Sequence, residues 1–416
     1  MSLENLILEI RQQFYWVDEC PLTGKRVYLE NAGGALTLKT VVEASAKFAA
    51  IPDNIGRPNE ASTALERIIS RGKRDMFDFF GVEHGEVFVG ETGTELLFRL
   101  IGAVIASDKS QSVVVGSTLE HPATRSACAH WSKRLGARYI QIEHDVETGL
   151  VTPGAYAHMV TPDTRVATVL HTSPITGMGV DLPAIAQAIR TIAPDCYIIV
   201  DGIQHAAHGS VDLSSYGVDA YVISPYKVFS RHGYGIAWIS PRLAGLPHCH
   251  LEGSAQSNWE LGTRDVGAFA TFSEVVSYLD WLGGTQTDSQ DRRARLRAAG
   301  AAIKEHEALL VDRILNGAGN LKGLISIEGL ALIGSAAAQA REGLVSFTIE
   351  SREALDIVEL LEARGIRTHL RKNDYYSGNI LQPLGIDACV RASVCHYNTI
   401  AEIDRFLLAL HDILAA

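Results

Sequence analysis

Short apolar runs alternate with longer amphipathic stretches from about residue 85 to residue 240. The apolar runs predict seven strands, at 86–90, 112–116, 138–142, 166–170, 196–200, 220–223 and 235–239. Apolar residues at helical spacing predict helices near 93–107, 122–135, 183–193 and 264–282. Strands that alternate with helices build a mostly parallel sheet that is covered by helices. We therefore predict an α/β fold, whose large domain is a doubly wound, mostly parallel seven-stranded sheet.

The pattern changes after residues 281–289, a stretch rich in Gly, Thr and Asp. A charged, Ala-rich helix is predicted near 290–316, followed by strands at 343–349 and 388–394 and helices at 352–364 and 399–414. These elements predict a smaller C-terminal α+β domain. We assign residues 1–25 to an N-terminal segment that packs on the small domain, 26–285 to the large domain and 286–416 to the small domain.

The amino-acid composition limits the kinds of molecule that the protein is expected to bind. The chain has 416 residues, 47% of them hydrophobic, and a net charge of −11, which argues against nucleic acid or an anionic membrane as a partner. No apolar run reaches the roughly 18 residues of a membrane span, and the N-terminus lacks the features of a signal peptide. Six scattered cysteines without a CxxC pair indicate reduced thiols, so we expect a cytoplasmic protein.

The most informative chemistry lies where two neighbouring predicted strands end. Asp201 ends the run 196–200, and Lys227 closely follows the run 220–223. Adjacent strands of an open α/β sheet bring such residues to one edge, where these sheets bind ligands. An acid at the base of a site and a lysine at its mouth are what pyridoxal phosphate requires. The lysine amine forms a Schiff base with it, and the acid keeps its pyridine nitrogen protonated.

Each of these residues also has a simpler interpretation when it is taken alone. Lys227 would be a solvated surface lysine, and Asp201 would cap the helix that follows its strand. Gln204, three residues after Asp201, could donate a hydrogen bond to the ring hydroxyl of the cofactor or be a surface amide. His121 follows the strand 112–116 and could stack on the cofactor ring and relay protons, or be a capping or core histidine.

A phosphate group requires clustered donors at the N-terminus of a helix. Gly93 and Thr94 follow a strand and open a helix, so their amides and the Thr94 hydroxyl suit that role. Thr92 and Glu95 also fit an N-terminal capping box, and both interpretations can hold together. The remaining candidate donors to a phosphate are Ser224, Tyr226 and Thr263.

Arg391 lies on a predicted strand of the small domain, where a guanidinium fork suits a substrate carboxylate. A surface salt bridge is the simpler interpretation. Arg367 is a second candidate for the same role.

Together these residues resemble the class V aminotransferase family, and within it the cysteine-desulfurase-like branch. The resemblance covers nearly the whole chain and is carried by Asn31-Ala-Gly-Gly, Glu120-His121, Asp201-Gly-Ile-Gln204, Ser224-Pro-Tyr-Lys227, Gly262-Thr263, and Arg391-Ala-Ser with Tyr397-Asn398-Thr. It implies a fold type I pyridoxal phosphate enzyme that acts on a small amino-acid substrate. It also implies a homodimer with active sites at the subunit interface.

By position, the resemblance implies that Lys227 is the Schiff-base lysine and that Asp201 pairs with the pyridine nitrogen. It assigns Gln204 to the ring hydroxyl and His121 to stacking on the ring. The phosphate donors that it implies are Thr94, Ser224, Tyr226 and, from the other subunit, Thr263. We assign the substrate side to Arg391, Arg367 and Asn31, and we assign no residue to a metal.

Three departures from the desulfurase pattern bear on the reaction. The stretch 368–379 contains no cysteine, where desulfurases carry the cysteine that forms a persulfide. Ser173-Pro174 stands where they have an asparagine that contacts the ring hydroxyl, and Tyr226 stands where a histidine is usual. Cys249 could serve as an alternative nucleophile or be an ordinary loop thiol.

We therefore predict a pyridoxal phosphate-dependent transferase that acts at the α-carbon of an amino acid, either an aminotransferase or a desulfurase-like enzyme. A β-eliminating carbon–sulfur lyase and an epimerase are the alternatives within this chemistry. A metallohydrolase is the alternative of another class, although the chain has no HExxH motif. It would be built from Asp201 and from His121, His171, His205, His208, His232, His248 and His250.

Overall fold

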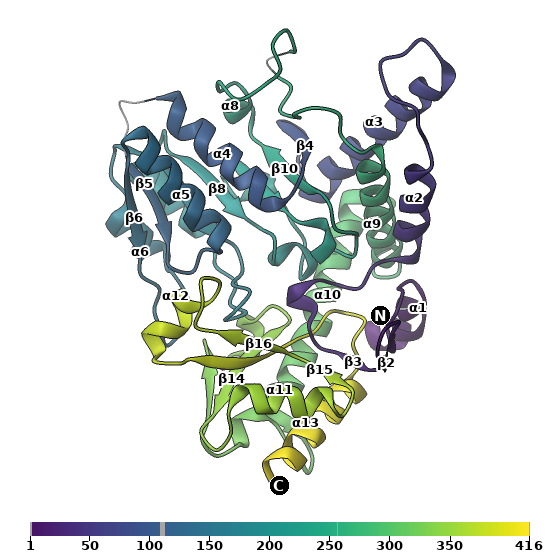
Figure 1. Cartoon of the computed structure of the whole chain (residues 1–416), viewed down its shortest axis with the longest axis vertical. Coiled ribbons are helices and arrows are strands. Elements are labelled where there is room, and N and C mark those ends of the chain that lie inside the picture. Colours follow the sequence, from purple (N-terminus) through teal and green to yellow (C-terminus); the bar gives the residue numbers. More distant parts are fainter. Residues whose placement is uncertain (1, 109–112, 256, 416) are drawn as a thin grey trace.

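A seven-stranded sheet forms the centre of the large upper part of the molecule (Figure 1). The computed structural model describes residues 2–108, 113–255 and 257–415. The sheet has the strand order β4-β10-β9-β8-β7-β5-β6, and only β10 runs antiparallel to its neighbours. Its strands are β4 (Glu86–Gly90), β5 (Val113–Ser117), β6 (Arg138–Ile142), β7 (Thr164–Leu170), β8 (Tyr197–Asp201), β9 (Ala220–Ile223) and β10 (Gly235–Ile239). The predicted fold class and all seven strands are confirmed, although Ser112, predicted to begin the second strand, lies outside the described residues.

The central strands are buried on both faces. Along β8, Ile198 and Val200 belong to one core cluster, whereas Tyr197 and Ile199 belong to another. A strand whose alternate side chains enter two different cores is covered on both sides, as in doubly wound folds. By the same alternation, Asp201 lies on the side of Tyr197 and Ile199.

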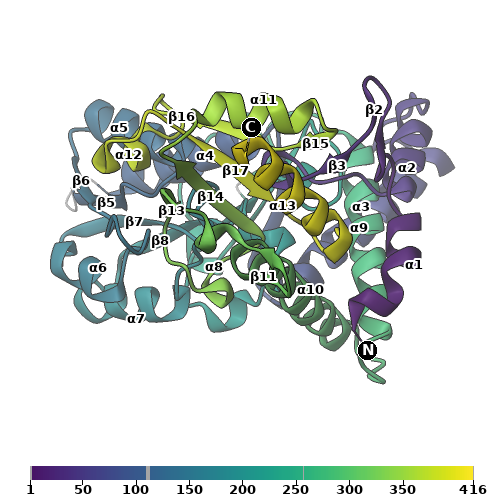
Figure 2. The ribbon, with the colours of Figure 1, turned by 90° about the horizontal axis from the view of Figure 1, so that it is seen from below.

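Helices form the two outer layers. The helices α4 (Gly93–Ser107) and α5 (Pro122–Leu135) cover the face to which Ile199 points, and α6 (Pro153–Met159) and α7 (Leu182–Ile192) cover the other. Figure 2 shows these two pairs on opposite sides of the strands. Beyond β4, α2 (Lys39–Ala49) and α3 (Glu60–Phe80) pack on α9 (Val266–Gly284). The sequence analysis assigned neither α2 nor α3.

The lower part of the molecule contains a second sheet, which is antiparallel and has four strands (Figures 1 and 2). Its order is β13 (Leu330–Ile333), β14 (Leu344–Ile349), β17 (Ala388–Ser393) and β16 (His369–Lys372). The helices α11 (Ala354–Glu362) and α13 (Ile400–Ala415) share a separate core with it. The short helix α12 (Gly378–Leu381) follows β16 and lies beneath the large sheet.

The long helix α10 (Arg292–Asn316) joins the two parts, and the segment 285–291 connects it to α9. Leu296 and Ile303 on α10 belong to the core of the large sheet, whereas Leu310 and Ile314 belong to the core of the small sheet. The core of the large sheet also includes Ile333, Cys389 and Tyr397 from the C-terminal part, and the predicted domains, 26–285 and 286–416, remain a proposal.

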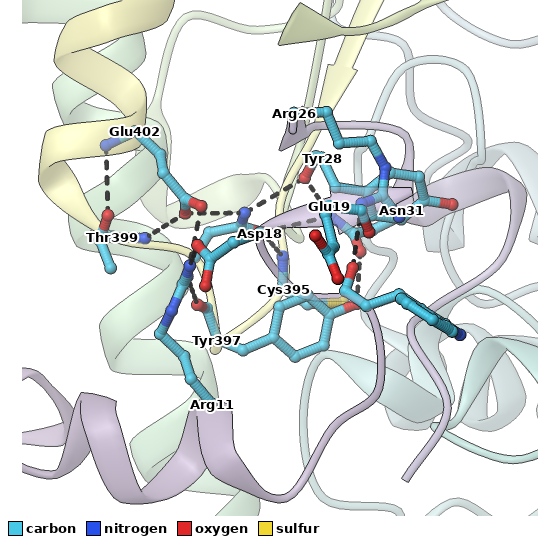
Figure 3. A network of polar contacts seen from close by, with 12 residues as sticks. Arg11, Asp18, Glu19, Arg26, Tyr28, Asn31, Cys395, Tyr397, Thr399 and Glu402 are labelled. Atoms are coloured by element: carbon cyan, nitrogen blue, oxygen red, sulfur yellow. Dashed lines mark hydrogen bonds and ion pairs between the residues drawn. The ribbon is translucent and has the colours of Figure 1, made fainter. Parts of the chain in front are cut away.

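The N-terminal segment contacts both parts. Leu6 of η1 (Leu3–Leu6) and Ile10 of α1 (Ile7–Gln12) pack into the core of the large sheet. The Arg11 guanidinium donates to the carbonyl oxygen of Tyr397 at 2.7 Å and to Glu402 at 3.2 Å (Figure 3). The apolar side of the segment therefore packs beside the large sheet, and its polar side is bound to residues that follow β17.

All six cysteines are free thiols. Among the helices that the structure describes, none is long and apolar enough to cross a membrane.

Candidate active site

The predicted cofactor residues follow the carboxyl ends of four strands of the large sheet. Gly93 follows β4, His121 follows β5, Asp201 ends β8 and Lys227 follows β9. These strand ends meet at one edge, as the topology of an open α/β sheet requires. A single cavity there is lined by Thr94, His121, Leu170, Pro174, Asp201, Ile203, Gln204, Ser224, Tyr226 and Lys227.

Lys227 is held on a short turn, η5 (Pro225–Lys227). The amides of Lys227 and Val228 bond to the carbonyl oxygens of Ser224 and Pro225, at 2.9 and 2.8 Å. Phe229 then adopts a left-handed backbone with φ of 62°. Such a conformation costs a bulky residue roughly 1–3 kcal/mol. The buried Phe229 ring packs edge-on against Phe14 and His396, which fixes the turn that carries the lysine.

The Lys227 amine faces Gln204, to whose side-chain oxygen it donates at 3.2 Å. Burial lowers the pKa of Lys227 to about 8, and the positive charge of Arg391 contributes further. About half of the amine is therefore uncharged at pH 8. An uncharged amine is the form that acts as a nucleophile or as a base.

Asp201 is almost fully buried, with 2% of its surface exposed. Its carboxylate accepts a hydrogen bond from the amide of Ile203 at 3.1 Å and a longer one from the Thr124 hydroxyl at 3.4 Å. Burial raises the pKa of Asp201, while the amide of Ile203 and the charge of Lys227 act in the opposite sense. A cationic group in the cavity would keep the carboxylate ionised by direct pairing.

His121 caps the N-terminus of α5, as one of its simpler interpretations predicted. Its Nδ1 accepts from the amide of Ala123 at 3.2 Å, so Nδ1 carries no proton. Burial and the charge of Lys227 lower the pKa of His121 to about 3. The ring is therefore a neutral, flat wall of the cavity at physiological pH, which suits stacking better than it suits donating a proton.

The start of α4 offers donors to an anion. Thr92 caps this helix by accepting from the amide of Glu95 at 3.0 Å, so the capping interpretation holds as well. A Cβ at Gly93 would lie 2.7 Å from the Ser224 hydroxyl oxygen, so only glycine lets the helix start approach that hydroxyl. The hydroxyls of Thr94 and Ser224 have no hydrogen-bond partner within the described chain.

This donor set fits pyridoxal phosphate. Bare amides at the start of α4 and two unpartnered hydroxyls suit a phosphate, the buried carboxylate suits a ring nitrogen, and the Lys227 amine suits an aldehyde. Tyr226 lines the same cavity, and its ring stacks on His232 with centroids 4.3 Å apart. Thr263 is exposed and does not line the cavity of its own chain.

Arg391 approaches the cavity from the small sheet. It is 2% exposed, and its Nη1 donates to the carbonyl oxygen of Pro174 at 2.9 Å. Its Nε has no partner among the described residues. Burial and the charge of Arg371 lower the pKa of Arg391 to about 9. A buried cation with unused donors beside the cavity suits an incoming carboxylate.

Arg371 is a site residue that the sequence analysis missed. It lies on β16, two positions after His369. His369 pairs with Arg391 on the neighbouring strand β17. Residues two apart on a strand share a face, so Arg371 and Arg391 lie on the same side of the small sheet. The charge of Arg371 lowers the pKa values of both Lys227 and His121. Alternation along the sequence does not separate Arg371 from Arg367, and the pairing of β16 with β17 is what identifies it.

None of the three substrate candidates is itself among the residues that line the cavity, and within the described part of the chain only Arg391 of the three bonds to a lining residue, Pro174. Arg367, on β15 (Ile366–Arg367), bonds to Glu362 at 3.2 Å and to Thr23 at 3.3 Å. The amide nitrogen of Asn31 donates to the carbonyl oxygen of Ser393 at 2.8 Å (Figure 3). Its oxygen accepts from the Tyr397 hydroxyl. Asn31 therefore ties the segment before α2 to the end of β17, and both assignments to the substrate remain predictions.

The histidines of the alternative metal site are distributed over several places. His171 stacks on His205 with centroids 3.6 Å apart, and His248 stacks on Trp259 in the loop after α8 (Pro241–Ala244). Among the described residues, one group could bring three ligand atoms together, and it consists of His208, Glu307 and Cys395. Both ring nitrogens of His208 already face protein partners, Gln204 and Glu307, so no imidazole nitrogen is left for a cation.

The loop after β16 lies beside the cavity and contains no cysteine. Tyr376 in this loop packs near His121, with ring centroids 5.8 Å apart. The Arg125 guanidinium on α5 holds the loop, because it donates to the carbonyl oxygen of Tyr375 and to the Asn379 side chain, each at 3.1 Å. Cys249, the alternative nucleophile, is exposed in the loop after α8, which projects at the top of Figure 1.

Comparison with known proteins places the geometry in context. The family model of class V aminotransferases matches residues 27–406. Aminotransferase-like protein FGM3 of Gibberella zeae is 25% identical over 99% of this chain and 98% of its own length. Cysteine desulfurase-like protein ustD of Aspergillus flavus is 26% identical over 94% of this chain and 88% of its own length.

Among solved structures, the apo cysteine desulfurase of Thermococcus onnurineus NA1 superposes with a TM-score of 0.80. It is 20% identical, and the match covers 96% of this chain and 97% of that one. The similarity shows that the two chains share a fold.

Proposed function

Because the chain belongs to the class V aminotransferase family, whose members are pyridoxal phosphate enzymes, we propose that it binds this cofactor and activates the α-carbon of an amino acid. The observation that carries the proposal is the single cavity in which the Lys227 amine, the buried Asp201 carboxylate and the donors at the start of α4 converge. No simpler interpretation of these residues, taken one at a time, explains why they line the same cavity.

Each residue has a distinct task in this proposal. Thr94, Ser224 and the amide of Gly93 hold the phosphate, and the neutral His121 ring lies against the cofactor ring. Asp201 holds a proton on the ring nitrogen. When bound, pyridoxal phosphate withdraws electrons from the α-carbon of an attached amino acid and so makes its proton acidic. Lys227 is the base that removes this proton, since its pKa of about 8 leaves about a tenth of the amine uncharged at pH 7 and about half at pH 8.

The substrate carboxylate binds to Arg391, with Arg371 adding positive charge on the same sheet face. Pro174 limits the position of the Arg391 guanidinium, because its carbonyl oxygen accepts from Nη1 at 2.9 Å. The Ser173 hydroxyl is used locally, since it accepts from the amides of Ile175 and Thr176 at 3.3 and 3.1 Å. The turn that presents Pro174 to the cavity is therefore fixed before the substrate arrives.

Transferase chemistry of the aminotransferase or desulfurase type is the reaction we propose. Sulfur transfer through a persulfide on the loop after β16 is not part of it, because residues 368–379 contain no cysteine. The same observation supports β-elimination as the second candidate, since elimination requires an acid near the leaving group and not a thiol. Tyr376, whose ring centroid lies 5.8 Å from that of the His121 ring, is the residue we propose for such an acid.

We propose that the active unit is a homodimer, in which Thr263 completes the phosphate site of the partner subunit. Analytical ultracentrifugation should give about twice the 45.1 kDa of one chain. Thr263→Ala should weaken retention of the cofactor about tenfold, which is the effect of one lost charge-assisted hydrogen bond. Mixing Thr263→Ala with Lys227→Ala subunits should restore one intact site in each mixed dimer. A monomer, or no recovery on mixing, would contradict this arrangement.

The reaction itself is tested by incubating the cofactor-loaded protein with a panel of amino acids. Transamination should give a keto acid together with pyridoxamine phosphate, in equal amounts and without free ammonia. Elimination should give a keto acid, ammonia and the released β-group (sulfide when the substrate is cysteine) in equal amounts while pyridoxal phosphate is retained. An epimerase should exchange the α-proton with solvent deuterium. Measuring cofactor and metal content on the same sample provides the control. Stoichiometric zinc with no pyridoxal phosphate would overturn the proposal in favour of the metallohydrolase.

A further inference from the structure

Four polar side chains form a continuous line that leads away from the cavity into the protein interior. The Lys227 amine lies 3.2 Å from the Gln204 oxygen, and the Gln204 nitrogen lies 3.0 Å from Nε2 of His208. Nδ1 of His208 lies 2.7 Å from a carboxylate oxygen of Glu307 on α10. His208 and Glu307 are each 2% exposed. Of the two carboxylate oxygens of Glu307, only the one bonded to His208 has a partner among the described residues.

The hydrogens in this line have one consistent arrangement. The Gln204 amide nitrogen can only donate, so Nε2 of His208 must accept. The ring proton then lies on Nδ1 and is donated to Glu307. In this state His208 is neutral, and the Gln204 oxygen faces the cavity, where it accepts from Lys227.

A second proton on the His208 ring would require the Gln204 side-chain amide to exchange the positions of its oxygen and nitrogen. Nε2 would then become a donor, and it would require the oxygen of Gln204 in place of the nitrogen. Turning the side-chain amide by half a turn satisfies this requirement and points the nitrogen into the cavity. Burial by itself lowers the pKa of His208, but the Glu307 carboxylate outweighs it and raises that pKa above its usual value. The Glu307 carboxylate therefore favours the second proton on His208.

We propose that Glu307 and His208 are positioning residues, which decide whether the oxygen or the nitrogen of the Gln204 amide faces the cofactor. This inference rests on the proposed function, because the group that it concerns is the ring hydroxyl of pyridoxal phosphate. In the unloaded chain the Gln204 oxygen accepts from the Lys227 ammonium. With pyridoxal phosphate bound, Lys227 would no longer donate to this oxygen, and the ring oxygen would need a donor. A proton taken by His208 from solvent would let the Gln204 nitrogen supply that hydrogen bond.

Other charged groups near His208 come from several elements. Glu342, in the segment before β14, favours the protonated ring, and Lys227 opposes it. His396, in the segment after β17, carries a pKa lowered to about 3 by burial and by the neighbouring histidines, so it adds no charge at neutral pH. Burial raises the pKa of Cys395 well above its usual value, so it remains a neutral thiol. Of the two carboxylates, Glu307 and Glu342, it is Glu307 that is hydrogen-bonded to the His208 ring, and it therefore has the larger effect on the protonation of that ring.

The test follows the visible spectrum of the cofactor-loaded protein as pH is varied. Glu307→Gln preserves shape but removes the charge that favours protonated His208, so the Gln204 oxygen should keep facing the cofactor. The ring oxygen then loses a donor that stabilises its ionised form. The midpoint of the spectral titration should rise by about one pH unit, the shift that corresponds to one ordinary hydrogen bond.

The matched control is Glu342→Gln. Glu342 forms another buried pair with His205, at 2.9 Å, but the ring of that histidine is not hydrogen-bonded to the Gln204 side chain. This variant should leave the midpoint within about 0.2 units of the wild type, a small fraction of the shift expected from one hydrogen bond. Gln204→Met should raise the midpoint by the same amount as Glu307→Gln. The double variant should show no further shift than Gln204→Met, because Glu307 acts through Gln204.

A second measurement does not depend on the folding of any variant. In protein labelled with nitrogen-15 histidine, Nε2 of His208 should be unprotonated without cofactor and protonated with it at the same pH. An unchanged midpoint in Glu307→Gln, an equal shift in Glu342→Gln, or no change at His208 on loading would overturn the inference. A wild-type protein that takes up no pyridoxal phosphate would instead overturn the proposed function, and this inference with it.

Discussion

Replacing Lys227 with alanine is expected to lower kcat/KM about 10³-fold or more, the effect of removing a well-placed base together with the amine that anchors the cofactor. The phosphate donors, His121 and Asp201 remain, so the variant should still bind pyridoxal phosphate without a covalent link. Borohydride treatment followed by peptide mass analysis should locate the cofactor on Lys227 in the wild type and on no residue in the variant. A small primary amine in solution should restore part of the rate by supplying the missing base.

The control for this prediction is Lys304→Ala, which removes an exposed lysine from the surface of α10. It should keep kcat/KM within about twofold, since surface substitutions away from a site have small effects. A Lys227→Ala protein that turns over substrate at the wild-type rate would remove the basis of the proposed function.

Arg391→Leu should lower kcat/KM about 10²-fold, mostly through KM. Two charge-assisted hydrogen bonds to a carboxylate are lost, and each contributes roughly 1.5–3 kcal/mol, part of which is offset by solvent that enters the cavity. The pH profile provides a second readout. The charge of Arg391 is one cause of the lowered pKa of Lys227, so removing it should raise that pKa above about 8. Less of the amine is then uncharged at neutral pH, and the rate should reach its plateau at a higher pH than in the wild type.

Two further variants separate a charge effect from a geometric one. Arg391→Lys keeps the charge and loses the planar fork, so it should leave the pH profile in place while KM rises about tenfold. Arg367→Leu distinguishes the two arginines that the sequence proposed for the carboxylate. The Arg367 guanidinium is bound to Glu362, whereas Arg391 bonds to Pro174 of the cavity lining, so we expect a change below about threefold. An equal loss in Arg367→Leu and Arg391→Leu would contradict the assignment of the substrate carboxylate.

The large sheet could be read from the sequence because its strands are buried on both faces. Runs such as Val113–Ser117 and Tyr197–Asp201 are almost continuously apolar, and the helices between them keep a regular apolar spacing. The region before residue 85 offered no such contrast. There α3 exposes most of its polar residues and buries a narrow stripe that includes Leu65, Met76 and Phe80. Its place is decided by packing on α9, which is more than 180 positions later in the chain.

The cofactor side of the candidate site was also predictable. Parallel strands carry the residues at their carboxyl ends to one edge, so Asp201 and Lys227 had to approach one another once the strands were recognised. The substrate side depends on a different sheet. Arg371 and Arg391 share a face only because β16 pairs with β17, and Arg367, four positions earlier, belongs to β15 and points elsewhere. Sequence spacing does not distinguish these arginines, whereas strand pairing does.

The sequence by itself determined the fold class, and it predicted the cofactor chemistry and the lysine that we propose for it, because each depends on local pattern and on the fixed geometry of parallel strands. Only the tertiary structure decided the protonation of His121, the uncharged fraction of Lys227 and the direction in which the Gln204 amide faces. These properties depend on burial and on partners far along the chain, such as Arg391 and Glu307. Electrostatic effects of this kind follow distance in space, which separation along the sequence does not measure.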